Sequence, residues 1–399
     1  MRLALEADRT GITVGRFVYG KNYLGNPDVV PIAPLELKLG TATCRTTKLN
    51  GTFGALGDSC PDDWERRVFE THAGGAWLGE IDCLLHAPDD RAGALGFGLG
   101  LESPAPKREF NKTLDLDELL TLADAVIADG PEARQVEDLM LIGTSMGGAR
   151  PKTVVEDMNG LRVAMFNRPD DRWKHARVEH AMLERAKARG LMTLHSRVQT
   201  VGDRDVPLVR RFDREKTGGG HLRARMISGL PIPRAEDTRQ QRDRWSYVLL
   251  ADELRRMCID PGRETAELFR RMVFNAQISN SDDHLRNHAA IAKAKDWRLS
   301  PACDLTPSMP ISLERRDLAM NCGVLGRCAH ADNLLSQWAR FHLERVQAQV
   351  IIVAMEMQVA STWYEVSRRV GVSEKDCETV TSAFADPGFR LPLEGNADA

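Results

Sequence analysis

The pattern of apolar residues changes along the chain, from strand-like segments in the first half to helical segments in the second. Glycine-rich stretches such as "GITVGRFVYG" (11–20) and "GALGFGLGLE" (93–102) predict short strands and hairpins over residues 1 to about 105. After a polar, glycine-rich loop at 216–221, apolar residues recur mainly at helical spacing to about residue 382. Because 399 residues can bury more than one core, this change predicts two lobes of different class.

Four segments near the middle predict the elements that join the two halves. Residues 114–128 repeat apolar positions at helical spacing, and 161–166 ("LRVAMF") predict a strand. Residues 170–190 predict an amphipathic helix that ends at Gly190, and 206–215 ("VPLVRRFDRE") predict a strand that runs into a polar loop. The expected fold is therefore α+β, with a β-rich N-terminal lobe and an all-helical C-terminal lobe. Its expected parts are a β-rich N-terminal subdomain over 1–110, the remainder of the N-lobe over 111–212, and a helical C-lobe over 213–399.

Composition is that of a soluble globular protein. The chain is 42% hydrophobic and has no apolar run near the roughly 18 residues that a membrane span requires. A net charge of -3 excludes a generally basic nucleic-acid binder. Eight cysteines are too thinly spread for a disulfide framework, and no signal peptide precedes the first strand-like segment. We therefore expect a cytoplasmic protein with reduced thiols.

One group of residues has the composition of a zinc site. Cys322, Cys328 and His330 form a C-x5-C-x-H group. A fourth ligand is lacking nearby and the spacing differs from that of structural zinc sites, so we do not predict a metal there.

A glycine-rich motif, "GTSMGGARPK" (143–152), lies before a predicted strand. Glycine lets backbone amides approach an anion closely, and Arg150 and Lys152 add positive charge. The motif follows neither the P-loop nor the G-x-G-x-x-G pattern. Alone it is also typical of a plain turn, so it indicates phosphate binding only together with other motifs.

The densest polar motif is "ISNSDDHLRNHAAI" (278–291), which we call the polar segment. Phosphoryl transfer needs a carboxylate to orient and deprotonate a hydroxyl, and a nearby oxygen ligand for magnesium. Asp282 and Asn287 meet this description, with His284 between them. The alternative is a helix N-terminus in which Asn280 or Ser281 is the cap and the aspartates favour the helix dipole.

A third motif, "WRLSPACDLTPS" (297–308), is called the proline segment. It predicts a short strand that leads to Asp304 between Pro301 and Pro307. The prolines could simply mark a loop. A short strand pair would instead bring Asp304 beside Asn287, which is the order of base and metal residues that kinases use.

Taken together, these motifs resemble those of the HipA family, the serine/threonine kinase toxins of bacterial type II toxin–antitoxin systems. The resemblance rests on "ALGDSCPDDWERRVFE", "GTSMGGARPK", "RRFDRE", "SNSDDHLRNHAAI" and "LSPACDLTP", in the family's order along nearly the whole chain. It implies a two-lobed protein-kinase-like fold and the use of ATP and Mg2+. It also implies a HipB-like DNA-binding antitoxin as a separate partner, with an aminoacyl-tRNA synthetase as the default protein substrate and persistence as the outcome.

The resemblance also implies a role for individual residues. Asp282 would be the catalytic base, and Asn287 and Asp304 would hold magnesium. His284 and Arg286 would lie near the phosphates, and the backbone of Arg210 and Phe212 would pair with adenine. The glycine-loop residues that would cover the nucleotide are Gly147, Gly148, Ala149, Arg150 and Lys152. Ser145 falls at the family's autophosphorylation position.

One position departs from the family pattern. The strand after the glycine loop carries a lysine in the family, in a pattern like A-K-F, and Met165 stands there in this chain. A kinase needs fixed positive charge near the nucleotide phosphates, which methionine lacks. We therefore expect this chain to be nearly inactive, unless Lys152 has taken over the role.

Two other classes of function remain open at this point. A nucleotide-binding pseudokinase that acts through partner contacts is favoured by Met165 alone. A metal-dependent hydrolase would use Asp282, His284, His288 and Asp304, because His284 and His288 have the i, i+4 spacing of a helical metal site.

Overall fold

The structure is a computed structural model that describes most of the chain. The described residues are 1–60, 66, 78–86, 90–102, 104, 110–112, 115–129, 150–167, 171–236, 238–309, 311–312, 315–384 and 386–390. The chain divides into two compact units, each built from several segments. The first unit comprises Met1–Pro169, Gln199–Pro231 and Ala290–Trp297, and the second comprises Asp170–Val198, Ile232–Ala289 and Arg298–Ala399.

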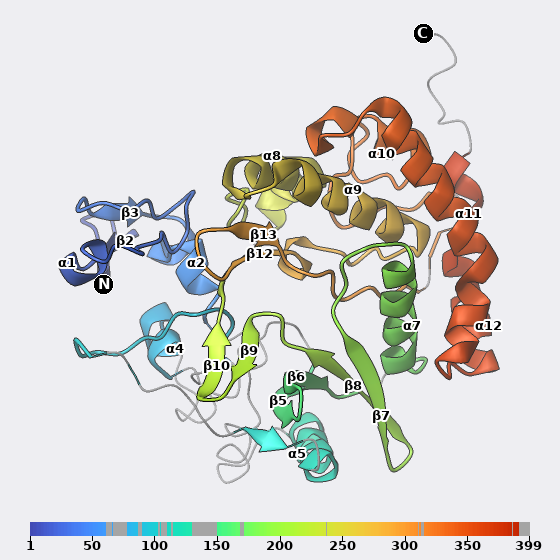
Figure 1. Cartoon of the computed structure of the whole chain (residues 1–399), viewed down its shortest axis with the longest axis horizontal. Coiled ribbons are helices and arrows are strands. Elements are labelled where there is room, and N and C mark those ends of the chain that lie inside the picture. The colour runs from blue at the N-terminus through green and yellow to red at the C-terminus, as the bar shows by residue number, and fades with distance from the viewer. Residues whose placement is uncertain are drawn as a thin grey trace. The chain divides into compact units, whose positions relative to one another are not determined.

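The described strands form four sheets (Figure 1). In sheet order they are β1 (Arg2–Ala7), β2 (Thr13–Val18) and β3 (Cys44–Thr46); β4 (Asn111–Lys112), β5 (Lys152–Asp157), β6 (Gly160–Met165), β8 (Arg204–Arg210) and β7 (Ser196–Val201); β10 (Gly220–Arg223) and β9 (Arg214–Thr217); and β11 (Arg225–Ser228), β12 (Ala289–Ala292) and β13 (Trp297–Leu299). The helices of the first unit are α1 (Lys21–Leu24), η1 (Leu49–Gly51), α2 (Gly54–Gly57), α4 (Glu80–His86) and α5 (Leu116–Asp129).

Strands β5 and β6 form an antiparallel pair whose two faces differ. Thr153 lies opposite Ala164, and Val155 opposite Arg162, while Lys152 lies opposite Met165. Val155 and Ala164 belong to a hydrophobic cluster with Leu116, Leu119 and Leu120 of α5. Because successive residues of a strand point to opposite faces, Lys152 and Met165 lie together on the face away from α5.

A buried ion cluster holds the segment after β8 in the first unit. The side chain of Asp213 is fully buried, and its Oδ2 accepts hydrogen bonds from Arg211 Nη2 (2.8 Å), Arg214 Nη1 (2.7 Å) and the backbone N–H of Gly93 (2.9 Å). The guanidinium groups also donate to the carbonyl oxygens of Asp90 and Arg91. Burial alone would raise the pKa of Asp213, but the two arginines outweigh it and lower that pKa to about 2.

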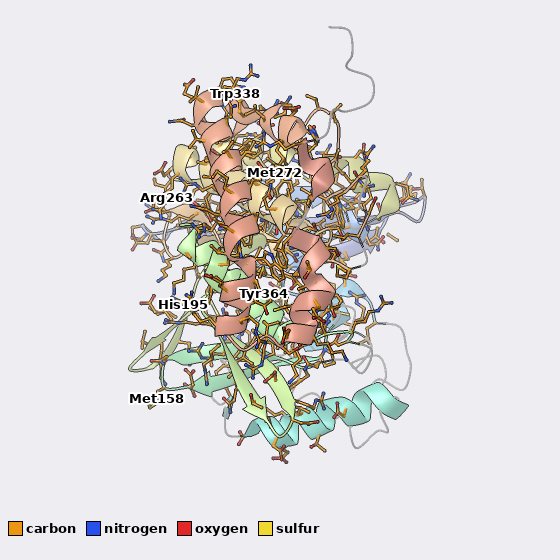
Figure 2. All side chains as sticks on the ribbon, turned by 90° about the vertical axis from the view of Figure 1, so that its right-hand side faces the viewer. Met158, His195, Arg263, Met272, Trp338 and Tyr364 are labelled. Atoms are coloured by element: carbon orange, nitrogen blue, oxygen red, sulfur yellow. The ribbon has the colours of Figure 1, made fainter. Side chains whose placement is uncertain are left out.

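The second unit is mainly helical. Its helices are α7 (His175–Ala188), η3 (Arg239–Arg244), α8 (Tyr247–Met257), α9 (Pro261–Gln277), η4 (Leu285–Asn287), α10 (Ala331–Leu335), η5 (Trp338–Phe341), α11 (Arg345–Arg369), α12 (Glu374–Phe384) and η6 (Pro387–Arg390). Figure 2 faces α11, which carries Tyr364 and lies beside α12. None of the described helices is long and apolar enough to cross a membrane.

Helix α9 is the most buried helix of this unit, and its start follows from its sequence. The side chain of Asp260 accepts a hydrogen bond from the backbone N–H of Arg263, and Pro261 occupies the first helical turn, where its missing N–H costs nothing. Polar side chains such as Glu264, Arg271 and Asn275 are also buried on this helix, so they must find partners inside the unit.

The long periodic segments are predicted well. The helix expected at 114–128 is α5, the strand expected at 161–166 is β6, and the helix expected to stop at Gly190 is α7, with Gly190 at a φ of 76°. The expectation of mainly helical structure after the polar loop at 216–221 is wrong at its start, because β9 and β10 flank this loop and β11 follows it. These strands have only four residues each, which is too short for a period to show.

We predict that Asp213→Asn lowers the free energy of unfolding by about 3–5 kcal/mol at neutral pH, because it leaves two buried arginines without their carboxylate. The pKa of Asp213 is about 2 in the folded chain against an ordinary 3.8, so the carboxylate's contribution is complete above about pH 4 and is lost as the pH falls toward 2. Urea unfolding at about pH 7 and pH 3 measures both effects. Asp203→Asn, at an exposed turn residue, is the matched control, and equal losses in the two variants would contradict the prediction.

Candidate functional site

The polar segment begins at a sharp turn after α9. Ser279 has a φ of 53°, the left-handed region that few residues other than glycine adopt. Its backbone N–H donates to Ala276 O, and that of Asn280 donates to Asn275 O. The chain therefore leaves the helix at once. The expected alternative of an α-helix start is wrong, because only the three-residue helix η4 follows, and His284 at its N-cap makes no side-chain cap.

Asp283 anchors the polar segment from within the second unit. Its side chain is 1% exposed, and Oδ2 accepts hydrogen bonds from the hydroxyl of Tyr247, from Asn275 Nδ2 (2.7 Å) and from His288 Nε2 (3.0 Å). Burial alone would raise the pKa of Asp283, but His288 and the hydroxyl of Tyr247 outweigh it and lower that pKa. Burial holds the pKa of Tyr247 well above its usual value, so this residue stays a hydroxyl donor.

The other polar side chains of the segment differ in their exposure to solvent. Asp282 and Arg286 are exposed, His284 is half-buried beside Trp245, and Asn287 is 8% exposed. Asn287 Nδ2 lies 3.5 Å from the backbone oxygen of Asp282, so its carboxamide oxygen is the atom that it can offer to another group. The structure thus places the predicted base and the predicted amide ligand in one short loop.

The proline segment is fixed by α9 and by the residues after α7. Glu264 of α9 accepts a hydrogen bond from the backbone N–H of Leu299 (2.9 Å), and Arg271 donates to Ser300 O (2.6 Å). Ala302 bonds through its backbone to both Met192 O (2.7 Å) and the N–H of Leu194 (3.0 Å). Buried charged side chains of α9 therefore fix the backbone that leads to Asp304, which lies two residues after Ala302.

The polar and proline segments are joined by a chain of side-chain amides. Asn275 donates to Asp283, Asn280 Nδ2 donates to Asn275 Oδ1 (3.1 Å), and the same Asn280 nitrogen donates to Asp304 O (2.9 Å). The thiol of Cys303 donates to Asn287 O (3.3 Å). Asp304 is exposed and has a φ of 54°, so its backbone is held in a strained conformation by these partners. The strand pair expected from the sequence is β12 and β13.

A pocket of about 140 Å³ lies beside the polar segment. Ser279 and Ser281 line it on one side, with Ser312, Arg315 and Arg316 among the other lining residues. Arg316 is buried and donates to Ser279 Oγ (2.7 Å) and to Ala383 O (3.2 Å). The pocket therefore has a polar wall next to the loop that carries Asp282.

The predicted nucleotide residues of the first unit are described in part. Lys152 is 6% exposed at the start of β5, and Met165 is half-buried at the end of β6. Arg210 is the exposed last residue of β8, and Phe212 is half-buried. Arg150 is half-buried. Four predicted residues lie outside the described part of the chain, namely Ser145, Gly147, Gly148 and Ala149.

The cysteine and histidine groups have other partners. The Sγ of Cys322 donates to Cys328 O (3.2 Å), and His330 Nδ1 accepts from the backbone N–H of Asp332. Among the described residues, no group of three or more His, Cys, Asp or Glu side chains is arranged to hold a metal ion by itself.

Sequence reasoning missed the anchoring residues Asp283, Tyr247 and Asn275. Asp283 stands next to Asp282, and the sequence alone gives the two aspartates similar weight. Tyr247 lies 36 positions earlier in the chain. One available signal was Asn275, a polar residue within the mainly apolar stretch that precedes the polar segment.

We predict that Asp283→Asn lowers the free energy of unfolding by about 3 kcal/mol, because three buried donors would lose a charged acceptor. The amide oxygen is neutral, so its hydrogen bonds to these donors would be weaker than those of the carboxylate. Asp282→Asn, at the exposed neighbouring position, should change that free energy by less than about 0.5 kcal/mol. Urea unfolding of both variants measures the difference, and similar losses at the two positions would contradict the assignment of Asp283 as the anchor.

Comparison with known proteins places the chain in a family. The model of the HipA-like C-terminal domain matches residues 144–369, more than half of the chain. The HipA toxin of Shewanella oneidensis MR-1, solved with HipB and operator DNA, has a TM-score of 0.68 at 16% identity, covering 96% of this chain and 92% of that chain. The Helicobacter pylori proinflammatory kinase CtkA has a TM-score of 0.39 at 12% identity, covering 60% of this chain and 91% of that one. No curated protein sequence matches significantly.

The family match covers β5, β6, the polar segment and the proline segment. The Shewanella structure extends the shared fold over nearly the whole chain. The chain therefore belongs to the HipA family and has its α+β, protein-kinase-like fold.

Proposed function

We propose that this chain is a HipA-type toxin, a serine/threonine protein kinase that transfers the γ-phosphoryl group of ATP to a serine of another protein and to its own Ser145. The observation that carries the proposal is the junction of the polar and proline segments. There Asn280 bonds to the backbone of Asp304, and Asn287 lies in the same loop as the exposed Asp282.

In the proposed reaction Asp282 accepts the proton of the attacking serine hydroxyl. A new bond forms between the serine oxygen and the γ-phosphorus, and the bond from that phosphorus to the bridging oxygen of ADP breaks, so ADP leaves with the electron pair. Asp282 suits this role because it is exposed to an incoming hydroxyl while its neighbour Asp283 fixes the backbone. The polar pocket beside Ser281 offers room for a side chain of the substrate protein.

The residues also fit a magnesium ion, which would neutralise charge on the phosphates. Magnesium prefers oxygen ligands and usually takes only one or two from a protein, the others coming from phosphate and water. Asn287 can offer its carboxamide oxygen, and Asp304 has an exposed carboxylate. The strained backbone of Asp304 supports a binding role, because strain of this kind clusters at functional sites.

We propose the nucleotide contacts on the basis of family membership. The amides of the glycine loop from Gly147 to Lys152, together with His284 and Arg286, would bind the phosphates, and the backbone of Arg210 and Phe212 would pair with adenine. The backbone N–H of Arg211 donates to Leu161 O, so this group bonds to the neighbouring strand and is not offered to adenine. Phosphorylation of Ser145 would stop the kinase by expelling the loop.

The partners and location are proposed on the same basis. The Shewanella HipA structure contains HipB and operator DNA, so a small HipB-like antitoxin is the partner that we propose. We propose an aminoacyl-tRNA synthetase as the substrate and the cytoplasm as the location, as in a toxin that halts translation and promotes persistence.

The hydrolase alternative is disfavoured by the structure. It requires His284 and His288 on one face of a helix, but these residues flank the short turn η4. His288 Nε2 is already bonded to Asp283 (3.0 Å). A pseudokinase remains the second candidate, because Met165 carries no charge.

A combined nucleotide-binding and transfer experiment tests the function. Mg-ATP should raise the melting temperature of the chain by mass action, and Asp304→Asn should abolish most of the magnesium-dependent part of that rise. Asp282→Asn should keep the rise but lose phosphate transfer to Ser145, read by intact mass. A magnesium-dependent rise that survives in Asp304→Asn would remove Asp304 from the site, and phosphorylation that survives in Asp282→Asn would remove Asp282 as the base.

We also predict that the purified chain alone hardly retards the DNA upstream of its own gene at physiological salt. Its net charge of -3 gives no general attraction to phosphates. Adding a small dimeric antitoxin should produce a retarded band that contains both proteins. Strong specific retardation by the chain alone would contradict the proposed division of roles.

A further inference from the structure

We propose that Lys152 supplies the phosphate-binding ammonium group that Met165 does not, so that this chain is a competent kinase as it stands. The inference rests on the proposed function and names the residue that completes it. It replaces the expectation of near inactivity that Met165 alone suggested.

The register of β5 and β6 carries the inference. Lys152 and Met165 are directly opposite one another in this antiparallel pair. Side chains at such positions point to the same face, with Cβ atoms about 4.5–5.5 Å apart. A lysine side chain carries its ammonium on a flexible four-carbon stem, whose reach is comparable to this separation. An ammonium from position 152 can therefore reach the region that a lysine at position 165 would serve.

The face on which the two residues lie carries both apolar and charged groups. Val154, Leu161 and Val163 are buried on it, while α5 packs against the opposite face. On the face of Lys152, Glu156 also binds His221 (3.3 Å) and Lys216 (3.3 Å), so charged side chains are accommodated beside the apolar ones.

The position of Lys152 along the chain favours the same role. It is the last residue of the glycine motif, so the backbone amides and the ammonium would come from one continuous stretch. Its side chain is almost completely buried, and an ammonium that is shielded from water interacts more strongly with a phosphate than an exposed one does. Burial also restricts its conformations before any nucleotide arrives. Methionine at position 165 is then a neutral neighbour that fills space beside it.

Exchange of the two residues tests the inference. The chain as it stands, Lys152→Met, Met165→Lys and the double variant K152M/M165K are compared by the rate of phosphate incorporation with Mg-ATP. We expect transfer by the unchanged chain, a loss of about a hundredfold to a thousandfold in Lys152→Met, and recovery of most of the rate in the double variant. Met165→Lys alone should stay within about tenfold of the unchanged chain. Lys295→Met, at an exposed lysine in the turn between β12 and β13, is the control and should transfer normally.

The outcomes separate this inference from the proposed function. Transfer by Met165→Lys together with an inactive unchanged chain would overturn the role of Lys152 and leave the kinase standing. A loss in Lys152→Met that the double variant does not recover would overturn the shared position, provided that urea unfolding shows both variants folded. Absence of transfer in all four proteins would contradict the proposed kinase itself.

Discussion

The carboxylate of Asp283 is the interaction on which the site depends. Its three donors come from α8, from α9 and from the residue before β12, so one oxygen atom joins three parts of the second unit. A buried carboxylate is costly unless it is fully hydrogen-bonded. Conformations that remove one of these donors are therefore unfavourable, and the network favours a single conformation. Because the polar segment cannot move without breaking this network, Asp282 is presented to solvent on a rigid backbone.

The same network explains how two segments distant in sequence form one site. Hydrogen bonds of Asn275 and Asn280 connect the side chain of Asp283 to the backbone of Asp304. Side-chain amides are suited to this because each can donate and accept at once. Preorganisation of this kind matters for phosphoryl transfer, where catalysis consists largely of positioning and of electrostatic stabilisation.

Much of the fold could be predicted from the sequence, and the parts that could not share a physical cause. Helices α5 and α7 and strand β6 are periodic over enough residues to reveal a buried face. The four-residue strands after residue 213 depend on their partners rather than on their own pattern. The "RRFDRE" motif hides a buried ion cluster, because arginine is usually exposed and only the tertiary structure shows Asp213 between two of them.

The candidate site divides in the same way. Asp282, Asn287 and Asp304 could be found because their chemistry imposes residue types and an order along the chain. Asp283, Tyr247 and Asn275 could not, because a supporting network needs only donors and acceptors at the right distance, and many sequences provide them. The pairing of Lys152 with Met165 also depended on the register of β5 and β6, which the turn between Asp157 and Gly160 sets and which the apolar pattern of these strands does not specify alone.

The facing pair on β5 and β6 has a consequence for how such proteins are compared. If a lysine at either position can bind the phosphates, natural selection preserves one lysine in the pair and not a lysine at a particular position. A lineage can gain a lysine on one strand, hold both for a time, and then lose the other, without an inactive ancestor at any step. Methionine at position 165 in an alignment would then record that the positive charge has moved to the facing strand, with activity kept. Counts of inactive kinases that rely on this one position would be too high.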